Sequence, residues 1–206
     1  MCVYSIQNID ASSHALDRLY YAHSGRRLFW FPAGQNFYFT PAVGEAAHDP
    51  LTNLWGRRHF NEILKQEVET SNRYGQALSL IILDIDDFKR VNDGHGHNAG
   101  DVILKELASV LKNNQRGSDV YARWGGEEFL VLMPGTSLDD AIITAERLRK
   151  GIEEASFSYV NNLTSSFGVA EYKSKFENDS FNKMLQRADH ALYQAKQKGK
   201  NCVVSA

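Results

Sequence analysis

From residue 49 onward, the hydrophobic positions switch repeatedly between a helical and a strand-like spacing. Apolar side chains three to four residues apart predict amphipathic helices over residues 57–74, 99–113, 139–154 and 181–198. Short runs rich in β-branched and aromatic residues predict strands over 78–85, 120–124, 128–133, 163–171 and 201–204. The central order of strand, helix, strand, strand, helix, strand is that of ferredoxin-like and palm-type domains. We therefore predict an α+β fold, with a central antiparallel sheet flanked by helices.

The first 48 residues have a different pattern. Two short aromatic runs on either side of residues 32–36 predict a hairpin over 28–40. A segment of this length with one hairpin would bury little surface by itself. We therefore expect two parts: an N-terminal appendage, or the tail of a sensory module, at residues 1–48, and a folded domain at residues 49–206.

Composition and charge narrow the class of protein. The chain has 206 residues, 43% of them hydrophobic, and 23 basic against 25 acidic residues give a net charge of −2. Such a balance argues against a protein that coats nucleic acid or an anionic membrane. Apolar runs are too short for a membrane span, the start lacks a signal-peptide pattern, and the two cysteines lack zinc-site spacing. We expect a cytoplasmic protein without a nucleic-acid partner. The aromatic residues expected in its core are Phe60, Phe129, Phe167 and Tyr193.

Two groups of acidic residues stand at the ends of predicted strands. Asp84, Asp86 and Asp87 close the most apolar strand, whereas Glu127 and Glu128 leave a predicted two-glycine turn. One interpretation is structural: the aspartates cap the next helical turn and the glutamates are solvated. The other is chemical, because carboxylate oxygens on adjacent strands suit Mg²⁺ bound together with substrate phosphates. Two such ions about 3.5–4 Å apart can activate an attacking hydroxyl and stabilise a leaving phosphate oxygen.

Five ordered motifs carry a family resemblance. The sequence WGGEEF at residues 124–129 resembles the signature of GGDEF-domain diguanylate cyclases, in its GGEEF variant. The other family-like motifs are DPLTNL with RR at 49–58, DIDDFKRVND at 84–93, GHNAGD at 96–101 and ADHALYQAKQKGKN at 188–201. The resemblance spans residues 49–204. It implies a GGDEF or nucleotidyl cyclase fold, and a homodimeric enzyme that condenses two GTP into cyclic di-GMP and two pyrophosphates. Each 3′-hydroxyl would attack the α-phosphate of the other nucleotide.

The same resemblance implies a metal site and the catalytic residues. Two Mg²⁺ per active site, with Mn²⁺ as an alternative, would be held by Asp84, the Ile85 carbonyl, Glu127 and Glu128. Glu128 is also the family's candidate for deprotonating the 3′-hydroxyl, so that Asp84, Glu127 and Glu128 are the expected catalytic residues. The two other aspartates of this segment are assigned to structural or capping roles.

The resemblance further implies a GTP site whose members come from several segments. These residues are Phe88, Lys89, Asn92, His97, Asp101, Gly125, Lys196 and Lys200. Asp101 would read guanine together with Asn92, because a carboxylate only accepts hydrogen bonds and guanine donates from N1 and N2. The alternative is that Asp101 begins the 99–113 helix. Lys200 departs from the arginine usual at its position; it keeps the charge but loses the planar fork.

An RxxD element lies just before the predicted hairpin. Arg116 and Asp119, with Arg147 on the next helix, resemble the family's inhibitory site for the cyclic product. The alternative is a surface turn with a weak ion pair. Two other functions stay open: a catalytically silent receptor for cyclic di-GMP, and a nucleotidyl cyclase or polymerase-like enzyme with another substrate. The intact GGEEF motif argues against the receptor, and Asp101 argues for guanine.

Overall fold

The structure is a computed structural model that describes residues 47–174 and 178–206. These residues belong to one unit, Val43–Ala206. The hairpin predicted at 28–40 lies outside the described residues. Among the helices that the structure describes, none combines the length and the hydrophobicity that a membrane crossing requires.

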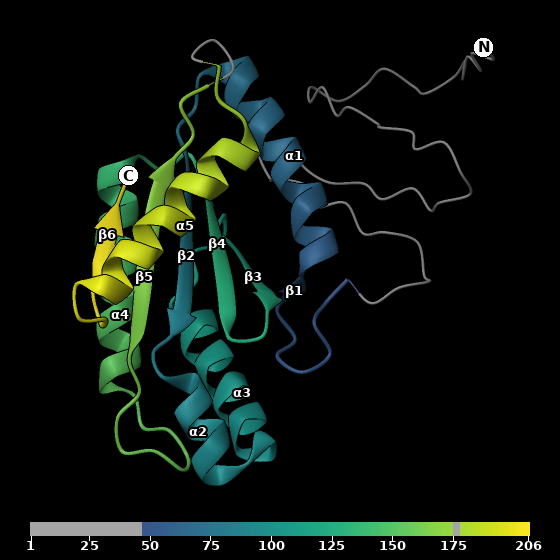
Figure 1. The fold of residues 1–206 in the computed structure, drawn as a ribbon. Helices are drawn as coiled ribbons and strands as arrows, with labels where there is room; N and C mark the ends of the chain where they lie inside the picture. The colour runs from purple at the N-terminus through teal and green to yellow at the C-terminus, as the bar shows by residue number, and fades with distance from the viewer. Residues whose placement is uncertain (1–46, 175–177) are drawn as a thin grey trace, which may run out of the picture. The chain divides into compact units, whose positions relative to one another are not determined.

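Along the described chain the elements follow in the order β1, α1, β2, α2, α3, β3, β4, α4, β5, α5 and β6 (Figure 1). The strands are Trp55–Gly56 (β1), Leu78–Ile85 (β2), Val120–Gly125 (β3), Glu128–Pro134 (β4), Ser165–Glu171 (β5) and Val203–Ser205 (β6). The helices are Arg57–Tyr74 (α1), Phe88–His95 (α2), His97–Asn113 (α3), Leu138–Glu154 (α4) and Phe181–Gln197 (α5). The predicted elements are confirmed to within about two residues, whereas β1 and the full length of α2 were not predicted.

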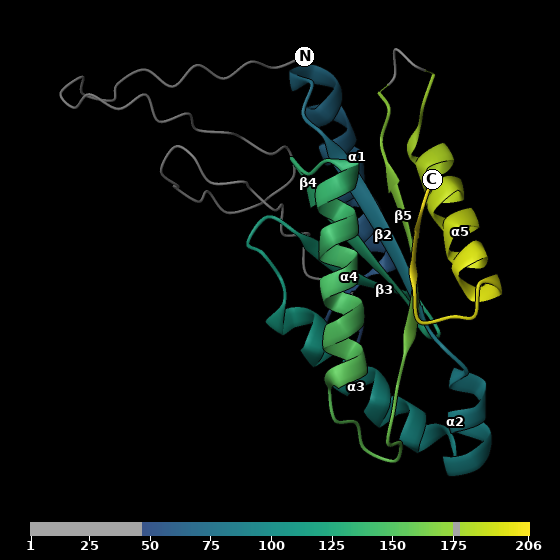
Figure 2. The same cartoon turned by 90° about the vertical axis from the view of Figure 1, so that its left-hand side faces the viewer.

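The strands form one sheet in the order β1-β3-β4-β2-β5-β6. The four central strands pair antiparallel, and the two outer strands run parallel to their neighbours. Helices α3 and α4 cover one face of the sheet, while α1 and α5 cover the other (Figures 1 and 2). The predicted α+β fold with a central antiparallel sheet is therefore confirmed.

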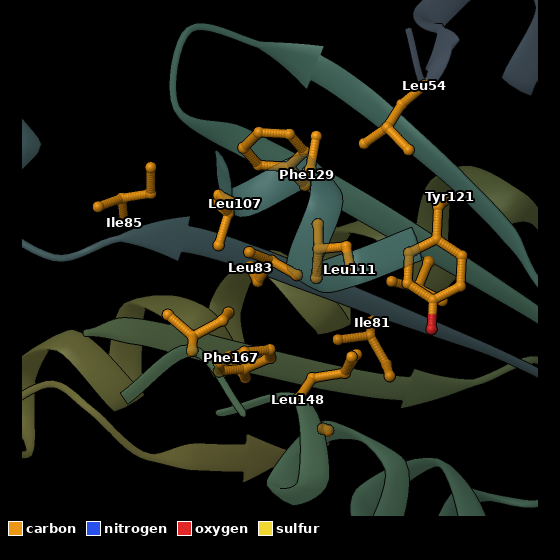
Figure 3. Packing of buried hydrophobic residues seen from close by; sticks show 14 of the residues in the cluster. Leu54, Ile81, Leu83, Ile85, Leu107, Leu111, Tyr121, Phe129, Leu148 and Phe167 are labelled. Carbon is orange, nitrogen blue, oxygen red and sulfur yellow. The ribbon is translucent and has the colours of Figure 1, made fainter. Parts of the chain in front are cut away.

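The central strand β2 contributes to both faces of the sheet. Ile81, Leu83 and Ile85 belong to the core cluster beneath α3 and α4, where Leu107 and Leu148 pack near them (Figure 3). Each such side chain contributes about 1.5–3 kcal/mol of hydrophobic stabilisation. Because successive strand residues point to opposite faces, the intervening positions, including Asp84, face α1 and α5. Burial of the whole strand thus fixes the direction in which Asp84 points.

Among the aromatic residues predicted in the core, three are buried and one is not. Phe60, Phe129 and Phe167 have no exposed surface, whereas Tyr193 is 60% exposed. The prediction for Tyr193 is wrong because α5 presents a narrow stripe of small and aliphatic residues to the sheet. Leu192 belongs to this stripe, and the next residue on a helix points away from it.

Helix α5 lies unusually close to β5. A methyl group at Gly168 of β5 would come within 2.0 Å of the Ala188 carbonyl oxygen and 2.4 Å of the Leu192 nitrogen. Both atoms belong to the helix backbone, which has little freedom to move aside. The absence of a side chain at residue 168 therefore sets the depth at which α5 packs on the sheet.

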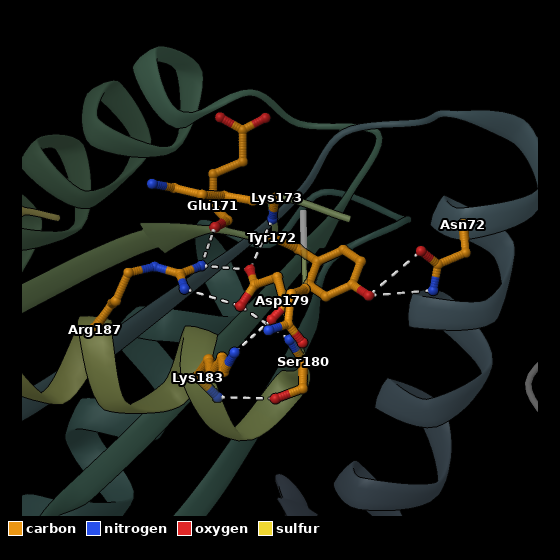
Figure 4. A network of polar contacts seen from close by, with 9 residues as sticks. Asn72, Glu171, Tyr172, Lys173, Asp179, Ser180, Lys183 and Arg187 are labelled. Carbon is orange, nitrogen blue, oxygen red and sulfur yellow. Dashed lines mark hydrogen bonds and ion pairs between the residues drawn. The ribbon is translucent and has the colours of Figure 1, made fainter. Parts of the chain in front are cut away.

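A polar network holds the C-terminal end of β5, at Glu171 (Figure 4). Arg187 of α5 donates to both carboxylate oxygens of Asp179 and to the Glu171 carbonyl, at 2.7–2.9 Å. The Tyr172 hydroxyl and the Asn72 side chain of α1 pair within 3.3 Å. Burial alone would raise the pKa of Asp179, but the hydrogen bonds and charge of Arg187 and two backbone N–H groups lower it to about 2.

Asp179 is expected to stabilise the domain only while it is ionised. Its pKa is lower in the folded chain than the ordinary 3.8, so its contribution is complete above about pH 4 and lost as the pH falls to about 2. Between these pH values the free energy of unfolding should change by about 2 kcal/mol because of Asp179, and Asp179→Asn should abolish this change. Urea unfolding at a series of pH values measures it. The exposed Asp189→Asn on α5 serves as the control and should leave the pH profile unchanged.

Candidate active site

Three acidic residues lie at the same end of the central strands. Asp84, near the end of β2, lies directly opposite Glu128, the first residue of β4. Glu127 occupies the turn before β4, and the charges of both glutamates act on Asp84. Residues directly opposite in an antiparallel pair point to the same face, so Asp84 and Glu128 share the face covered by α5. The structure thus brings together the three expected catalytic residues.

The hairpin that carries the glutamates differs by one residue from the prediction. Gly125 pairs with Glu128, which makes Gly126 and Glu127 the two loop residues in place of the two glycines. Gly126 has a φ of +52°, a conformation that suits glycine at the first loop position. A register shift between Arg123 and Gly125 leaves an extra residue on β3. The shift places Glu127 in the loop, at the end of the sheet where its charge acts on Asp84.

Burial and the charges of the two neighbouring glutamates disfavour the ionised form of Asp84. Its side chain is only 9% exposed, and its Oδ1 forms an ion pair with Lys196 Nζ of α5 at 2.9 Å. Burial raises the pKa of Asp84 to about 6; Lys196 opposes this rise, and the charges of Glu127 and Glu128 add to it. The single ammonium therefore does not offset the effect of burial on Asp84, and further positive charge would favour the ionised form of this carboxylate.

The composition of this cluster fits a hard divalent cation. Its side-chain donors are all carboxylate oxygens, which Mg²⁺ prefers. Among the described residues, no three His, Cys, Asp or Glu side chains are gathered closely enough to hold a metal ion by themselves. Mg²⁺ does not need such a cage, because it commonly binds through one or two carboxylates plus substrate phosphates. The residues that would hold it are Asp84, Glu127, Glu128 and the Ile85 carbonyl.

Arg123 connects the catalytic hairpin to the start of the domain. Its Nε and Nη2 donate to the Gly126 carbonyl at 3.0 and 2.9 Å, and its Nη1 contacts Asp49 at 3.2 Å. Asp49 in turn accepts from the Thr52 N–H and hydroxyl. Burial would raise the pKa of Asp49, but Thr52 and Arg123 together lower it. Arg123 was not predicted from the sequence; its place two residues before the glycines was the available signal.

The residues expected to bind guanine lie around the close contact of α2 with α3. A methyl group at Gly100 would come within 2.1 Å of Asn92 Oδ1 and 3.1 Å of Phe88 Cζ. Asp101 follows this glycine and is exposed. Since α3 begins at His97, Asp101 lies inside the helix and not at its start. The alternative that Asp101 stabilises the helix N-terminus loses its basis, because dipole effects fall off after the first turn.

The two remaining aspartates of this segment have different roles. Asp86 accepts from the Thr164 and Ser166 hydroxyls at 2.7 and 2.6 Å and from the Asn201 N–H at 3.0 Å. Its role is therefore structural: it joins the β2 end to β5 and to the turn that holds Lys200. Asp87 is the N-cap residue of α2, but its side chain does not cap the helix. It pairs instead with Lys200 Nζ at 2.7 Å.

The RxxD element gathers around a buried carboxylate. Asp119 is 2% exposed, and its Oδ2 has no hydrogen-bond partner among the described residues. Burial raises the pKa of Asp119, while contacts and charge from Arg116 and the charge of Arg147 oppose this rise. Arg147 reaches the same turn by donating to the Asn114 carbonyl at 3.3 Å. All three residues expected at the inhibitory site thus lie close together, with both arginines exposed.

Three further residues expected at the GTP site have exposed positions. They are Lys89 on α2, His97 at the start of α3 and Gly125 at the hairpin. Neither Lys89 nor His97 joins an ion pair with the described residues. Their side chains are accessible to a ligand, and their assignment stays a prediction.

Comparison with known proteins identifies the family. The model of the diguanylate cyclase GGDEF domain matches residues 46–202. The chain belongs to this family. Diguanylate cyclase A of Treponema denticola is 42% identical over 161 residues, which cover 75% of this chain and 43% of the relative. The response regulator PleD of Caulobacter vibrioides is 40% identical over 164 residues, covering 77% and 36%. The chain therefore spans less than half the length of these relatives.

Solved GGDEF domains share the fold. The GGDEF domain of DgcB from Caulobacter crescentus, in complex with c-di-GMP, superposes with a TM-score of 0.73 at 32% identity, covering 80% of this chain and 98% of that one. The active GGEEF domain of a diguanylate cyclase from Vibrio cholerae gives a TM-score of 0.69 at 30% identity, covering 73% and 96%. The second domain carries the same GGEEF variant in its name.

Proposed function

We propose that this GGDEF domain is a diguanylate cyclase, which condenses two GTP into cyclic di-GMP and two pyrophosphates. The observation that carries the proposal is the cross-strand pair of Asp84 and Glu128, with Glu127 in the adjoining turn and Lys196 beside them. Family membership and the about 40% identity to named diguanylate cyclases support the same activity. Because GTP is an intracellular nucleotide, the reaction requires a cytoplasmic domain.

The proposed reaction forms one phosphodiester bond per nucleotide. The 3′-oxygen of one GTP bonds to the α-phosphorus of the other, the bond from that phosphorus to the β-phosphate bridging oxygen breaks, and pyrophosphate leaves. Glu128 accepts the 3′-hydroxyl proton. Two bound Mg²⁺, or Mn²⁺, would favour the ionised hydroxyl and stabilise charge on the phosphates.

The remaining residues bind and orient the nucleotide. Asn92 and Asp101 hydrogen-bond the guanine edge, next to Phe88, and His97 and Gly125 line the approach. Lys89, Lys196 and Lys200 contact the triphosphate, where a lysine at position 200 makes a point contact in place of a guanidinium fork. Each domain holds one GTP, so a symmetric reaction brings two domains face to face in an isologous dimer.

Product analysis after incubation with GTP and Mg²⁺ tests this function. Cyclic di-GMP and pyrophosphate in a 1:2 ratio are expected from the reaction stoichiometry. Binding of added cyclic di-GMP without turnover would favour the receptor, and turnover of ATP in preference to GTP would favour another nucleotidyl cyclase. Glu127 and Glu128 argue against a catalytically silent receptor for cyclic di-GMP, since a binding module needs no acidic hairpin.

Product inhibition is the proposed role of the RxxD element. Arginine stacks on purines and forks onto phosphates, so the exposed Arg116 and Arg147 around Asp119 suit a guanine dinucleotide. Burial of Asp119 without a partner for Oδ2 supports a carboxylate ready to accept from guanine N–H groups.

Arg116→Ala is expected to relieve product inhibition without lowering the initial rate. The substitution removes an exposed guanidinium of the RxxD element and leaves the acidic cluster unchanged. Initial rates with added cyclic di-GMP should show an inhibition constant raised at least about tenfold. Lys150→Ala, an exposed cation of the same helix as Arg147, is the control. An unchanged inhibition constant for both Arg116→Ala and Arg147→Ala would refute the assignment.

The division at residues 48 and 49 is also proposed. The family match begins at residue 46, which is close to this division. Since the reaction depends on pairing two domains, we assign control of dimerisation to residues 1–48. Equal dimerisation and turnover of the full chain and of residues 49–206 would contradict this assignment.

A further inference from the structure

Lys196 of α5 and Lys200, just after this helix, are paired with carboxylates at the end of β2 and just beyond it. Lys196 Nζ lies 2.9 Å from Asp84 Oδ1, and Lys200 Nζ lies 2.7 Å from Asp87 Oδ1. Both belong to the three lysines assigned to the triphosphate. Each therefore has a protein carboxylate as a partner, which an incoming phosphate must replace.

The two ion pairs differ in how strongly solvent screens them. The Asp84 side chain is 9% exposed, whereas Lys200 and Asp87 are 40% and 49% exposed. An exposed pair contributes little and is easily exchanged. The buried Asp84 depends much more on its ammonium, because the charges of Glu127 and Glu128 also act on it. Of the two ion pairs, only the one between Lys196 and Asp84 is therefore expected to contribute appreciably to the free energy of ligand binding.

A divalent cation bound at Asp84 would meet the Lys196 ammonium. The ammonium occupies Oδ1 at hydrogen-bond distance, so a cation on the same carboxylate would lie within a few ångströms of a like charge. The triphosphate offers Lys196 an alternative anion. A cation that replaces Lys196 at Asp84 would thus free the lysine for the triphosphate. A triphosphate that binds Lys196 would in turn free Asp84 for the cation.

We propose that Lys196 serves two partners in turn: it is the counter-ion of Asp84 until cation and triphosphate bind, and it then transfers to the phosphates while the cation takes Asp84. This exchange rests on the proposed function and adds to it a coupling between the two ligands. Because coupling free energy is reciprocal, metal alone and nucleotide alone each bind weakly, and each strengthens the other. The exchange makes cation binding a consequence of substrate arrival.

Binding of Mn²⁺ alone, followed by the spin-resonance signal of the free ion, tests the exchange without turnover. The full chain is measured without nucleotide at about pH 8, well above the range in which carboxylates titrate. Lys196→Gln should bind Mn²⁺ about tenfold more tightly than the unsubstituted chain, because the competing ammonium is gone. Lys200→Gln removes the same charge just after α5 but leaves Asp84 paired with Lys196. Its Mn²⁺ affinity should stay within about twofold of the unsubstituted chain.

Two results would overturn the proposal, and they are distinguishable. If Mn²⁺ binds in the presence of GTP but Lys196→Gln binds Mn²⁺ alone no more tightly than Lys200→Gln, the exchange fails and the proposed function stands. If the folded chain binds no Mn²⁺ with or without GTP, both fail. As a second measurement, Lys196→Gln should bind GTP in excess EDTA more weakly than the unsubstituted chain. An unchanged affinity there would show that Lys196 does not transfer to the phosphates.

Discussion

Replacement of Glu127 by glutamine is expected to lower GTP turnover by at least about a hundredfold while the domain stays folded. Glu127 lies in the two-residue turn and is partly exposed, so an amide of the same shape costs little stability. The amide loses the negative charge that the carboxylate cluster contributes to a cation. Initial rates of pyrophosphate release measure the effect, and circular dichroism measures the fold.

The exposed Glu154→Gln, at the end of α4, is the matched control for Glu127→Gln. It removes the same charge from the helix that covers the other face of the sheet from Asp84 and Glu128, and it should leave turnover unchanged. Turnover of Glu127→Gln within about tenfold of the unsubstituted chain would remove Glu127 from the metal-binding residues.

Replacement of Asp101 by asparagine is expected to lower kcat/KM for GTP by about a hundredfold or more and to weaken the choice of base. In the proposed site the carboxylate would accept from both guanine N1 and the 2-amino group, whereas an amide would present its own N–H₂ to one of these donors. Inosine triphosphate lacks the 2-amino group and makes the comparison specific. The ratio of kcat/KM for GTP over inosine triphosphate should fall toward one.

The control for Asp101→Asn is Asp139→Asn, an exposed carboxylate in the first turn of α4. Its substitution should change neither the rate nor the ratio of the two nucleotides. A ratio that stays the same in Asp101→Asn would mean that guanine is read elsewhere, even if the rate falls.

The sheet and the acidic cluster could largely be predicted from the sequence. Burial of β2 on both faces appears as an unbroken apolar run, and the period of two then assigns Asp84 to one face. The Gly-Gly-Glu-Glu run located the hairpin, although the loop proved to be Gly126 and Glu127. A bulge depends on how two strands pair, which a local pattern does not contain.

The contacts that link distant segments could not be predicted. Arg123 and Asp49 are separated by 74 positions, and their pairing requires β1 to lie beside β3. The Lys196–Asp84 pair depends on the depth at which α5 rests on the sheet. Charged side chains show no periodicity that would identify their partners, so such pairs emerge only from the packed structure.

That depth is set at Gly168, so β5 also fixes the distance between the Lys196 side chain of α5 and Asp84. A methyl group there would overlap with backbone atoms of α5, at Ala188 and Leu192. The helix would have to rise from the sheet, taking Lys196 away from Asp84. Gly168 thus has no chemical role, yet it controls the reach of a side chain two turns further along α5. Relatives with a larger residue at this position should hold the helix higher and need a longer side chain to span the gap.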